Sequence, residues 1–121
     1  MSSHQMVCHL GDSFLMMLGE REVSDASDFA QRTFVKWLAL YAPFKWPEGI
    51  ATLPEVDQKL GGTPPGDFTD DVAKVEMLIV RVSQRAGNCA PRHPIFGPMS
   101  ESAWYRWAYL HTDHHLRQFG A

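Results

Sequence analysis

Residues 69–86, TDDVAKVEMLIVRVSQRA, decide the class of fold. Apolar side chains recur there at alternating spacings of three and four, at Val72, Val75, Ile79, Val82 and Ala86. This spacing is typical of the buried face of a helix in a bundle, and a strand of this length would be abnormal. Asp67 or Thr69 can cap the start of the helix, and Gly87 can end it. We therefore predict a helix over residues 69–86.

Prolines mark the breaks on both sides of this helix. All eight lie within residues 43–65 and 91–98, and a proline inside a helix removes a hydrogen bond and clashes with the preceding turn. We expect loops in both stretches. The loop over residues 43–66 is longer than usual, so we expect it either to pack against the helices or to serve the function.

Three further helices are predicted, over residues 4–18, 28–41 and 101–118, each from apolar side chains at helical spacing. The apolar side expected for the second of them consists of Phe34, Trp37, Leu38 and Tyr41. The expected boundary residues are Gly19 after the first, Ser27 or Asp25 before the second, and Ser100 before the third. No alternating strand pattern of useful length is present. The predicted fold class is therefore all-α, a small helical bundle with long proline-rich loops.

Composition narrows the classes of partner. The 121 residues suit one domain, placed at residues 1–121, and the net charge of −3 without a basic run argues against nucleic-acid binding. No apolar stretch reaches the roughly 18–20 residues of a membrane span, and the N-terminus has no signal-peptide pattern. Cys8 and Cys89 cannot form a disulfide framework. We expect a cytoplasmic protein with neither nucleic-acid nor membrane partners.

The six histidines stand out in this composition. On a helical wheel for residues 101–118, one face carries Trp104, Trp107, Ala108, His111, His115 and Gln118. His111 and His115 are one turn apart, the spacing at which a helix offers two ligands to one metal. Thr112 stands where a zinc protease would carry its general-base glutamate, so protease chemistry is not supported.

A third imidazole could come from the first predicted helix, where His9 lies beside the apolar stripe. Three histidines would leave a fourth metal position open for water or substrate. The alternative is that these are core histidines, hydrogen-bonded to polar neighbours.

The remaining candidates are weaker. His4 is one turn before Cys8 and is expected to be a frayed surface residue, with metal ligation by Cys8 as a minor alternative. Both cysteines are expected to be small buried hydrophobic residues. His93 is expected to be a rigid loop residue or to border a pocket.

Several of these stretches carry a family resemblance. They are HPIFGP at residues 93–98, Trp104, HTDHHLRQFG at 111–120, HQMVCHL at 4–10, and Trp46-Pro47-Glu48-Gly49 followed by Thr52 and Pro54. Together they resemble an uncharacterised branch of the DinB-like (DinB/YfiT) superfamily, a domain of unknown function, over nearly the whole chain.

The resemblance implies an up-down four-helix bundle that holds a divalent metal, often zinc or nickel, through His9, His111 and His115. Characterised members of the superfamily include thiol-dependent isomerases and S-transferases that use low-molecular-weight thiols. Members carry a further helix before the one that matches residues 4–18, and the sequence starts inside the matching helix. Either this start is internal or truncated, or we expect the packing of the further helix to be supplied by the helix over residues 28–41 or by another chain. A bundle without one wall exposes an apolar groove, so we expect a homodimer in which a partner helix covers it.

Two functional hypotheses follow. The first is a metal-dependent enzyme of the thiol S-transferase or isomerase type that uses the three-histidine site on a thiol or another small molecule. The residues expected near its pocket are His114, His93, Trp104 and Gln118, and no general base is assigned. The alternative is a non-catalytic helical-bundle binding or stress-associated module, with or without bound metal.

Overall fold

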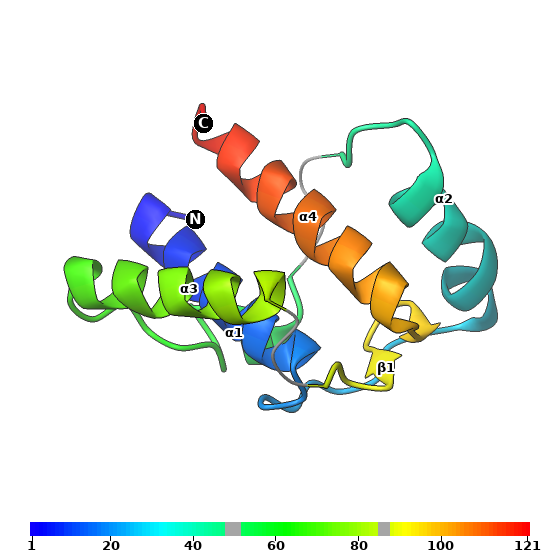
Figure 1. Cartoon of the computed structure of the whole chain (residues 1–121), viewed down its shortest axis with the longest axis horizontal. Coiled ribbons are helices and arrows are strands. Elements are labelled where there is room, and N and C mark those ends of the chain that lie inside the picture. Colours follow the sequence, from blue (N-terminus) through cyan, green and yellow to red (C-terminus); the bar gives the residue numbers. More distant parts are fainter. Residues whose placement is uncertain (48–51, 85–87) are drawn as a thin grey trace. The chain divides into compact units, whose positions relative to one another are not determined.

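The computed structural model describes residues 1–47, 52–84 and 88–121 (Figure 1). They form two compact units, each assembled from two separate segments of the chain. Unit 1 consists of Met1–Val23 and Thr52–Cys89, and unit 2 of Ser24–Ala51 and Ala90–Ala121. The prediction of one domain over residues 1–121 stays a prediction. No helix within the described ranges is both long enough and apolar enough to cross a membrane.

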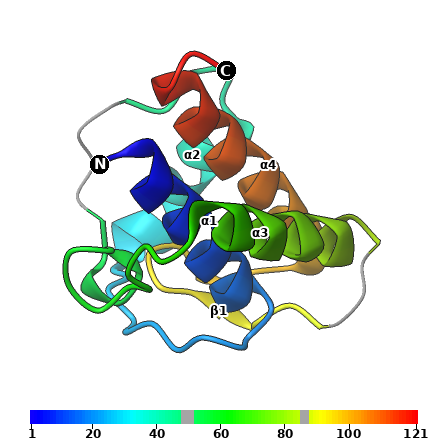
Figure 2. The same ribbon diagram turned by 90° about the vertical axis from the view of Figure 1, so that its left-hand side faces the viewer.

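Unit 1 is built on the packing of α1 (Ser3–Met17) against α3 (Phe68–Ser83), which cross in Figure 2. A capping box starts α1: the Ser2 hydroxyl accepts from the Gln5 backbone N–H, and the Gln5 side chain accepts from the Ser2 N–H. Gly19 follows the helix at a φ of 73°, a conformation that glycine adopts without strain. The first predicted helix and its stop are confirmed.

The α3 helix buries a different stripe from the predicted one. Asp67 caps it by accepting from the Asp70 N–H, as one of the two predicted caps. Val75 and Val82 are buried as expected, but Ile79 is 41% exposed and Asp71 is buried instead. A helix that packs on one neighbour buries only a narrow stripe, and the wheel alone does not fix which edge of the apolar face that stripe follows. The predicted end at Ala86 and Gly87 lies outside the described residues.

The second segment of unit 1 packs on α1 through a buried carboxylate. Asp12, which is 2% exposed, accepts hydrogen bonds from the Gln58 side chain (2.8 Å) and from the Thr63 N–H (2.8 Å) and hydroxyl (2.6 Å). Arg21 pairs with the same carboxylate at 3.3 Å. The part of the long loop over residues 52–66 therefore packs against a helix, which was one of the two expected outcomes.

Arg21 also holds the start of this loop. Its guanidinium donates to the backbone carbonyls of Glu55 (3.0 Å) and Gly61 (2.8 Å). Glu55 lies in the short 3-10 helix η2 (Pro54–Val56). These two loop carbonyls thus accept hydrogen bonds from a charged side chain.

Unit 2 is built on α4 (Glu101–Gln118), whose bounds are those predicted, with the Ser100 hydroxyl accepting from the Ala103 N–H. The expectation of no strands is wrong in one detail: β1 (Arg92–His93) and β2 (Gly97–Pro98) form a small antiparallel hairpin. Strands of two residues are too short to leave an alternating pattern in the sequence. The all-α class is confirmed, because the described residues are mostly helical and this hairpin is their only sheet.

The second predicted helix contains an irregularity. Its first part is a π-helix, η1 (Gln31–Val35), and its second part is α2 (Lys36–Tyr41), which lies beside α4 in Figure 1. The cap is Asp28 rather than Ser27 or Asp25: its side chain accepts from the Gln31 N–H at 2.7 Å, and the Gln31 side chain accepts from the Asp28 N–H at 3.0 Å. Asp25 instead accepts from Ser27.

The predicted apolar side of this segment is not the buried side. Phe34 and Trp37 are 65% and 57% exposed, whereas Leu40 is fully buried. A π-helix bonds residue i to i+5, so it rotates the following α-helix away from the face that a wheel of 3.6 residues per turn assigns. Arg106 of α4 holds α2 in this orientation by donating to the Leu40 carbonyl, with its guanidinium 5.4 Å from the Tyr41 ring centre.

We expect Asp12→Ala to lower the free energy of unfolding by about 3 kcal/mol, because it leaves buried donors and Arg21 without their acceptor. Asp12→Asn should lower the free energy of unfolding by less, since the amide oxygen of the asparagine can still accept a hydrogen bond from Thr63. Denaturant unfolding of the full chain measures both changes. The control is Asp113→Ala, which removes a half-exposed ion pair with Arg117 and should cost about 1 kcal/mol or less. Equal losses at the two positions would contradict the assigned role of Asp12.

The homodimer stays a prediction, and unit 2 offers it an apolar surface. Phe29, Phe34, Trp37 and Phe44 are each more than half exposed, and an interface would remove such side chains from water. We expect light scattering at micromolar concentration to give twice the mass of one chain, and Trp37→Glu to shift it to one. Met77→Glu, at a similarly exposed position on α3, is the control. A wild-type monomer would contradict the prediction.

Candidate metal centre

Unit 2 brings the two predicted histidines of α4 together at their ring nitrogens. The Nε2 atoms of His111 and His115 are 3.2 Å apart, and the rings meet edge to face with centroids 4.6 Å apart. Two nitrogens bound to one tetrahedral zinc at about 2.0–2.1 Å would lie roughly 3.3–3.4 Å apart. The observed spacing therefore fits two ligands of one ion. It also allows a single N–H···N hydrogen bond when no ion is bound.

Gln118 sets the orientation of the His115 ring and also contacts His114. Its side-chain oxygen accepts from His115 Nδ1 at 3.0 Å, so in the neutral ring the Nε2 lone pair of His115 is directed to His111. Its amide nitrogen donates to His114 Nε2 at 3.3 Å. A ligand histidine whose other ring nitrogen donates to an oxygen is the usual arrangement in metal sites.

Two tryptophans lie beside the histidines. Trp107 stacks on His111 with ring centroids 4.6 Å apart and an angle of 15°. Trp46 has its ring centre 6.2 Å from that of His111 and 5.9 Å from that of His114, and its indole N–H donates to the Ala39 carbonyl at 2.7 Å. Trp46 was not among the predicted pocket residues, although the Trp46-Pro47 motif carried the signal. Glu48 and Gly49 of the same motif lie outside the described residues.

His9, the third predicted ligand, is held in unit 1 by the long loop. Its side chain is buried on α1, and its Nδ1 donates to the Val56 carbonyl at 2.8 Å. This bond leaves the lone pair of the neutral ring on Nε2. Burial lowers the pKa of His9 below its usual value, so the ring is neutral at pH 7 and suited to metal binding.

His93 and Trp104, two other predicted pocket residues, lie in an aromatic cluster. His93 is 3% exposed and accepts from the N–H groups of Ile95 (3.0 Å) and Phe96 (3.2 Å) through Nδ1. Its ring centroid is 5.2 Å from that of Trp104, which is fully buried and donates to the Ala90 carbonyl. Burial, aided by the charge of Lys36, lowers the pKa of His93 to about 3. A group with this pKa is too weak a base to take a proton efficiently at neutral pH.

Unit 1 also contains a group of potential metal-ligand atoms that was not predicted from the sequence. His4 is not a frayed surface residue: its Nε2 is 2.8 Å from Asp71 Oδ2, and its ring meets the edge of Phe68 at a centroid distance of 5.1 Å. The Cys8 thiol donates to the same carboxylate oxygen at 3.7 Å. The sequence did not predict a role for Asp71 in such a group, because its burial depends on which edge of α3 meets α1.

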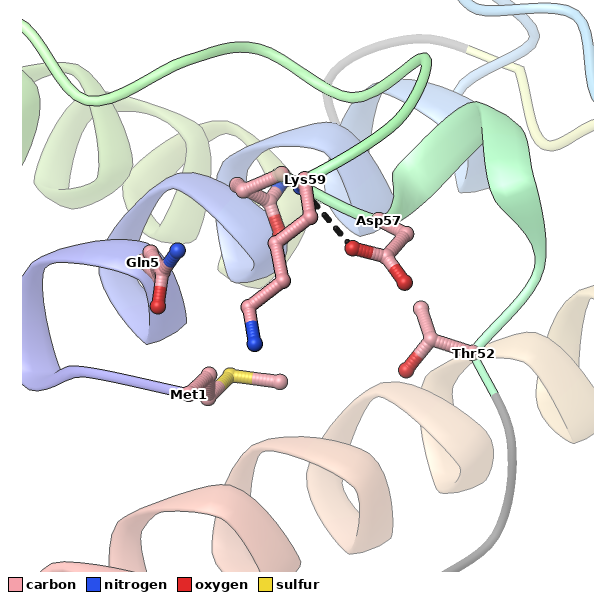
Figure 3. A pocket seen from close by; sticks show the side chains of 6 residues that line it. Met1, Gln5, Thr52, Asp57 and Lys59 are labelled. Atoms are coloured by element: carbon pink, nitrogen blue, oxygen red, sulfur yellow. Dashed lines mark hydrogen bonds between the residues drawn. The ribbon is translucent and has the colours of Figure 1, made fainter.

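A small pocket lies at the start of α1, and none of the predicted site residues lines it. Its volume is about 170 Å³, and it is bordered by Met1, Gln5, Thr52, Asp57, Gln58 and Lys59. Figure 3 shows the Lys59 side chain reaching toward Met1, while the Lys59 backbone N–H donates to the Asp57 carboxylate.

Comparison with known proteins identifies a family but no activity. Residues 25–121 match the family model described as protein of unknown function (DUF1569). The matched range contains Trp46, His111 and His115, and α1 lies before it. Neither the curated proteins nor the solved structures include a match to this chain.

The low pKa of His93 predicts a stability that depends on pH. The unfolded chain has a histidine pKa of about 6.5, so between that value and about 3 the unfolded state binds more protons than the folded state. The contribution of neutral His93 to the free energy of unfolding is complete above pH 6.5. It is lost as the pH falls toward 3, by up to about 1.4 kcal/mol per pH unit.

We expect His93→Asn to flatten this dependence, because the amide oxygen can accept the same two N–H bonds and does not titrate. Denaturant unfolding of both proteins from pH 7 to 4, with a chelator present, measures the difference. Parallel pH profiles for the two proteins would contradict the buried neutral state of His93.

Proposed function

This chain belongs to the DUF1569 family, whose function is unknown, so its chemistry has to be inferred from its own side chains. We propose that it binds a divalent metal ion through His9, His111 and His115, and that it acts on a low-molecular-weight thiol as DinB-like S-transferases and isomerases do. The observation that carries the proposal is the 3.2 Å approach of the His111 and His115 Nε2 atoms, with the His115 tautomer set by Gln118.

The donor set suits zinc or nickel. Neutral imidazoles bind both metals, and three of them leave an open position on the ion. His9 and His115 each carry the supporting hydrogen bond that metal ligands usually have, His9 to the Val56 carbonyl and His115 to the Gln118 side chain. His9 belongs to unit 1 and the α4 pair to unit 2. The His9→Ala variant therefore measures what His9 contributes to metal binding.

When bound, such an ion lowers the pKa of a thiol or water in its open position and so supplies a nucleophile at neutral pH. The chain's own residues would do the rest. Trp46 and Trp107 provide apolar ring surface beside His111. His114 lies next to the pair, with its ring centroid 5.1 Å from that of His115. Gln118 orients the His115 ring and contacts His114.

Metal analysis of untagged protein tests the binding step. We expect His111→Ala to remove about one equivalent of zinc or nickel from the wild-type content, and His9→Ala to weaken binding at that centre. Gln118→Ala should lower the affinity by roughly 10–100-fold, because it removes only a supporting bond. His93→Asn is the control and should leave the metal content unchanged. Unaltered affinity in His9→Ala would remove His9 from the site, and unaltered content in His111→Ala would overturn the proposal.

Turnover separates the enzyme from the binding module. With a low-molecular-weight thiol and an activated aryl chloride, the S–C bond forms, the C–Cl bond breaks, and the thiol proton is released with chloride. We expect metal-loaded wild-type protein to accelerate this reaction and the His111→Ala/His115→Ala variant to run at the rate without protein. Metal binding without turnover on any thiol and electrophile pair tested would favour the non-catalytic module.

A further inference from the structure

Unit 1 holds a second set of metal-ligand side chains that the proposed centre does not use. His4 and Cys8 lie one turn apart on α1, and Asp71 lies in the first turn of α3. One ligand atom from each of them lies within 4.8 Å of the other two. We propose that His4, Cys8 and Asp71 bind a zinc-like divalent cation that joins α1 to α3.

The distances are close to those of a bound ion. Tetrahedral zinc places a sulfur and a carboxylate oxygen roughly 3.6 Å apart, and a nitrogen and an oxygen roughly 3.4 Å apart. Cys8 Sγ is 3.7 Å from Asp71 Oδ2, and His4 Nε2 is 2.8 Å from the same oxygen. An ion therefore needs an outward movement of the His4 ring, whose ligand nitrogen lies within 4.8 Å of Cys8 Sγ. The His4 side chain is 24% exposed and lies near the start of α1, so it has room to move.

The surroundings hold the carboxylate in place. The Gly66 N–H donates to Asp71 Oδ2 at 2.9 Å, while Lys74 approaches the other oxygen at 3.5 Å with a side chain that is 71% exposed. Asp71 and Cys8 are both buried. A thiolate and a carboxylate together carry two negative charges, which a divalent cation neutralises, and a mixed sulfur, nitrogen and oxygen donor set suits zinc.

The arrangement does not suit Cys8 for nucleophilic catalysis. A catalytic thiol needs a base that removes its proton, but here Cys8 and His4 both direct their polar atoms to Asp71. Burial and the Asp71 charge raise the pKa of Cys8 to about 11, which keeps the thiol protonated at pH 7 when no cation is present. Cation binding would release this proton.

Cobalt(II), a spectroscopic substitute for zinc, tests the proposal in the full chain. The sample is the His111→Ala/His115→Ala variant, which removes the two α4 ligands of the other centre. We expect cobalt to give a near-ultraviolet charge-transfer band from thiolate to metal. The band should disappear in a Cys8→Ser background and persist in Cys89→Ser, the matched control, because these are the only two cysteines in the sequence. His4→Ala should weaken cobalt binding by about tenfold or more.

The wild-type spectrum tests the site even if Cys8→Ser fails to fold. A wild-type protein that binds cobalt without a thiolate band would overturn this site and leave the three-histidine proposal standing. A band that survives Cys8→Ser would also overturn it. Because the ion joins two helices, zinc should raise the melting temperature of the His111→Ala/His115→Ala variant, with no such rise after His4→Ala and Cys8→Ser are added.

Discussion

The buried carboxylate of Asp12 is the interaction on which unit 1 depends. A charge inside a protein is tolerated only when hydrogen bonds and an opposite charge replace its water. Thr63 and Gln58 supply those bonds, and Arg21 supplies the charge. Because Thr63 and Gln58 come from the second segment of the unit, the carboxylate fixes the path of a loop that has little regular structure of its own. The η2 turn in this loop then presents the Val56 carbonyl to His9.

The same requirement orients the imidazoles. A buried histidine has two ring nitrogens, and a partner for one of them decides the chemistry available at the other. His9 and His115 each give their Nδ1 proton to an oxygen and keep an Nε2 lone pair. His93 has the opposite arrangement, since its Nδ1 accepts from two backbone N–H groups within the hairpin. The hydrogen bonds of these histidines therefore distinguish the candidate metal ligands, His9 and His115, from the core residue His93.

The accuracy of the sequence predictions follows the regularity of each element. The bounds of α4 and its Ser100 cap were predicted correctly because an uninterrupted helix obeys one period from cap to end. For residues 28–41, the predicted cap and the predicted buried face were both wrong. The π-helix in this segment changes the helical period, and no residue in QRTFV predicts that change. The hairpin around His93 was missed because two-residue strands leave no pattern.

The sequence by itself determined the helical class, the loops set by the prolines, and the one-turn spacing of His111 and His115, because each depends on neighbours along the chain. Only the tertiary structure decided that Asp71 faces His4 and Cys8, and that Trp46 lies beside His111. It also decided that Val56 fixes the tautomer of His9. These contacts join residues tens of positions apart, and packing and the pairing of buried polar groups select them. Local periodicity carries no information about such partners.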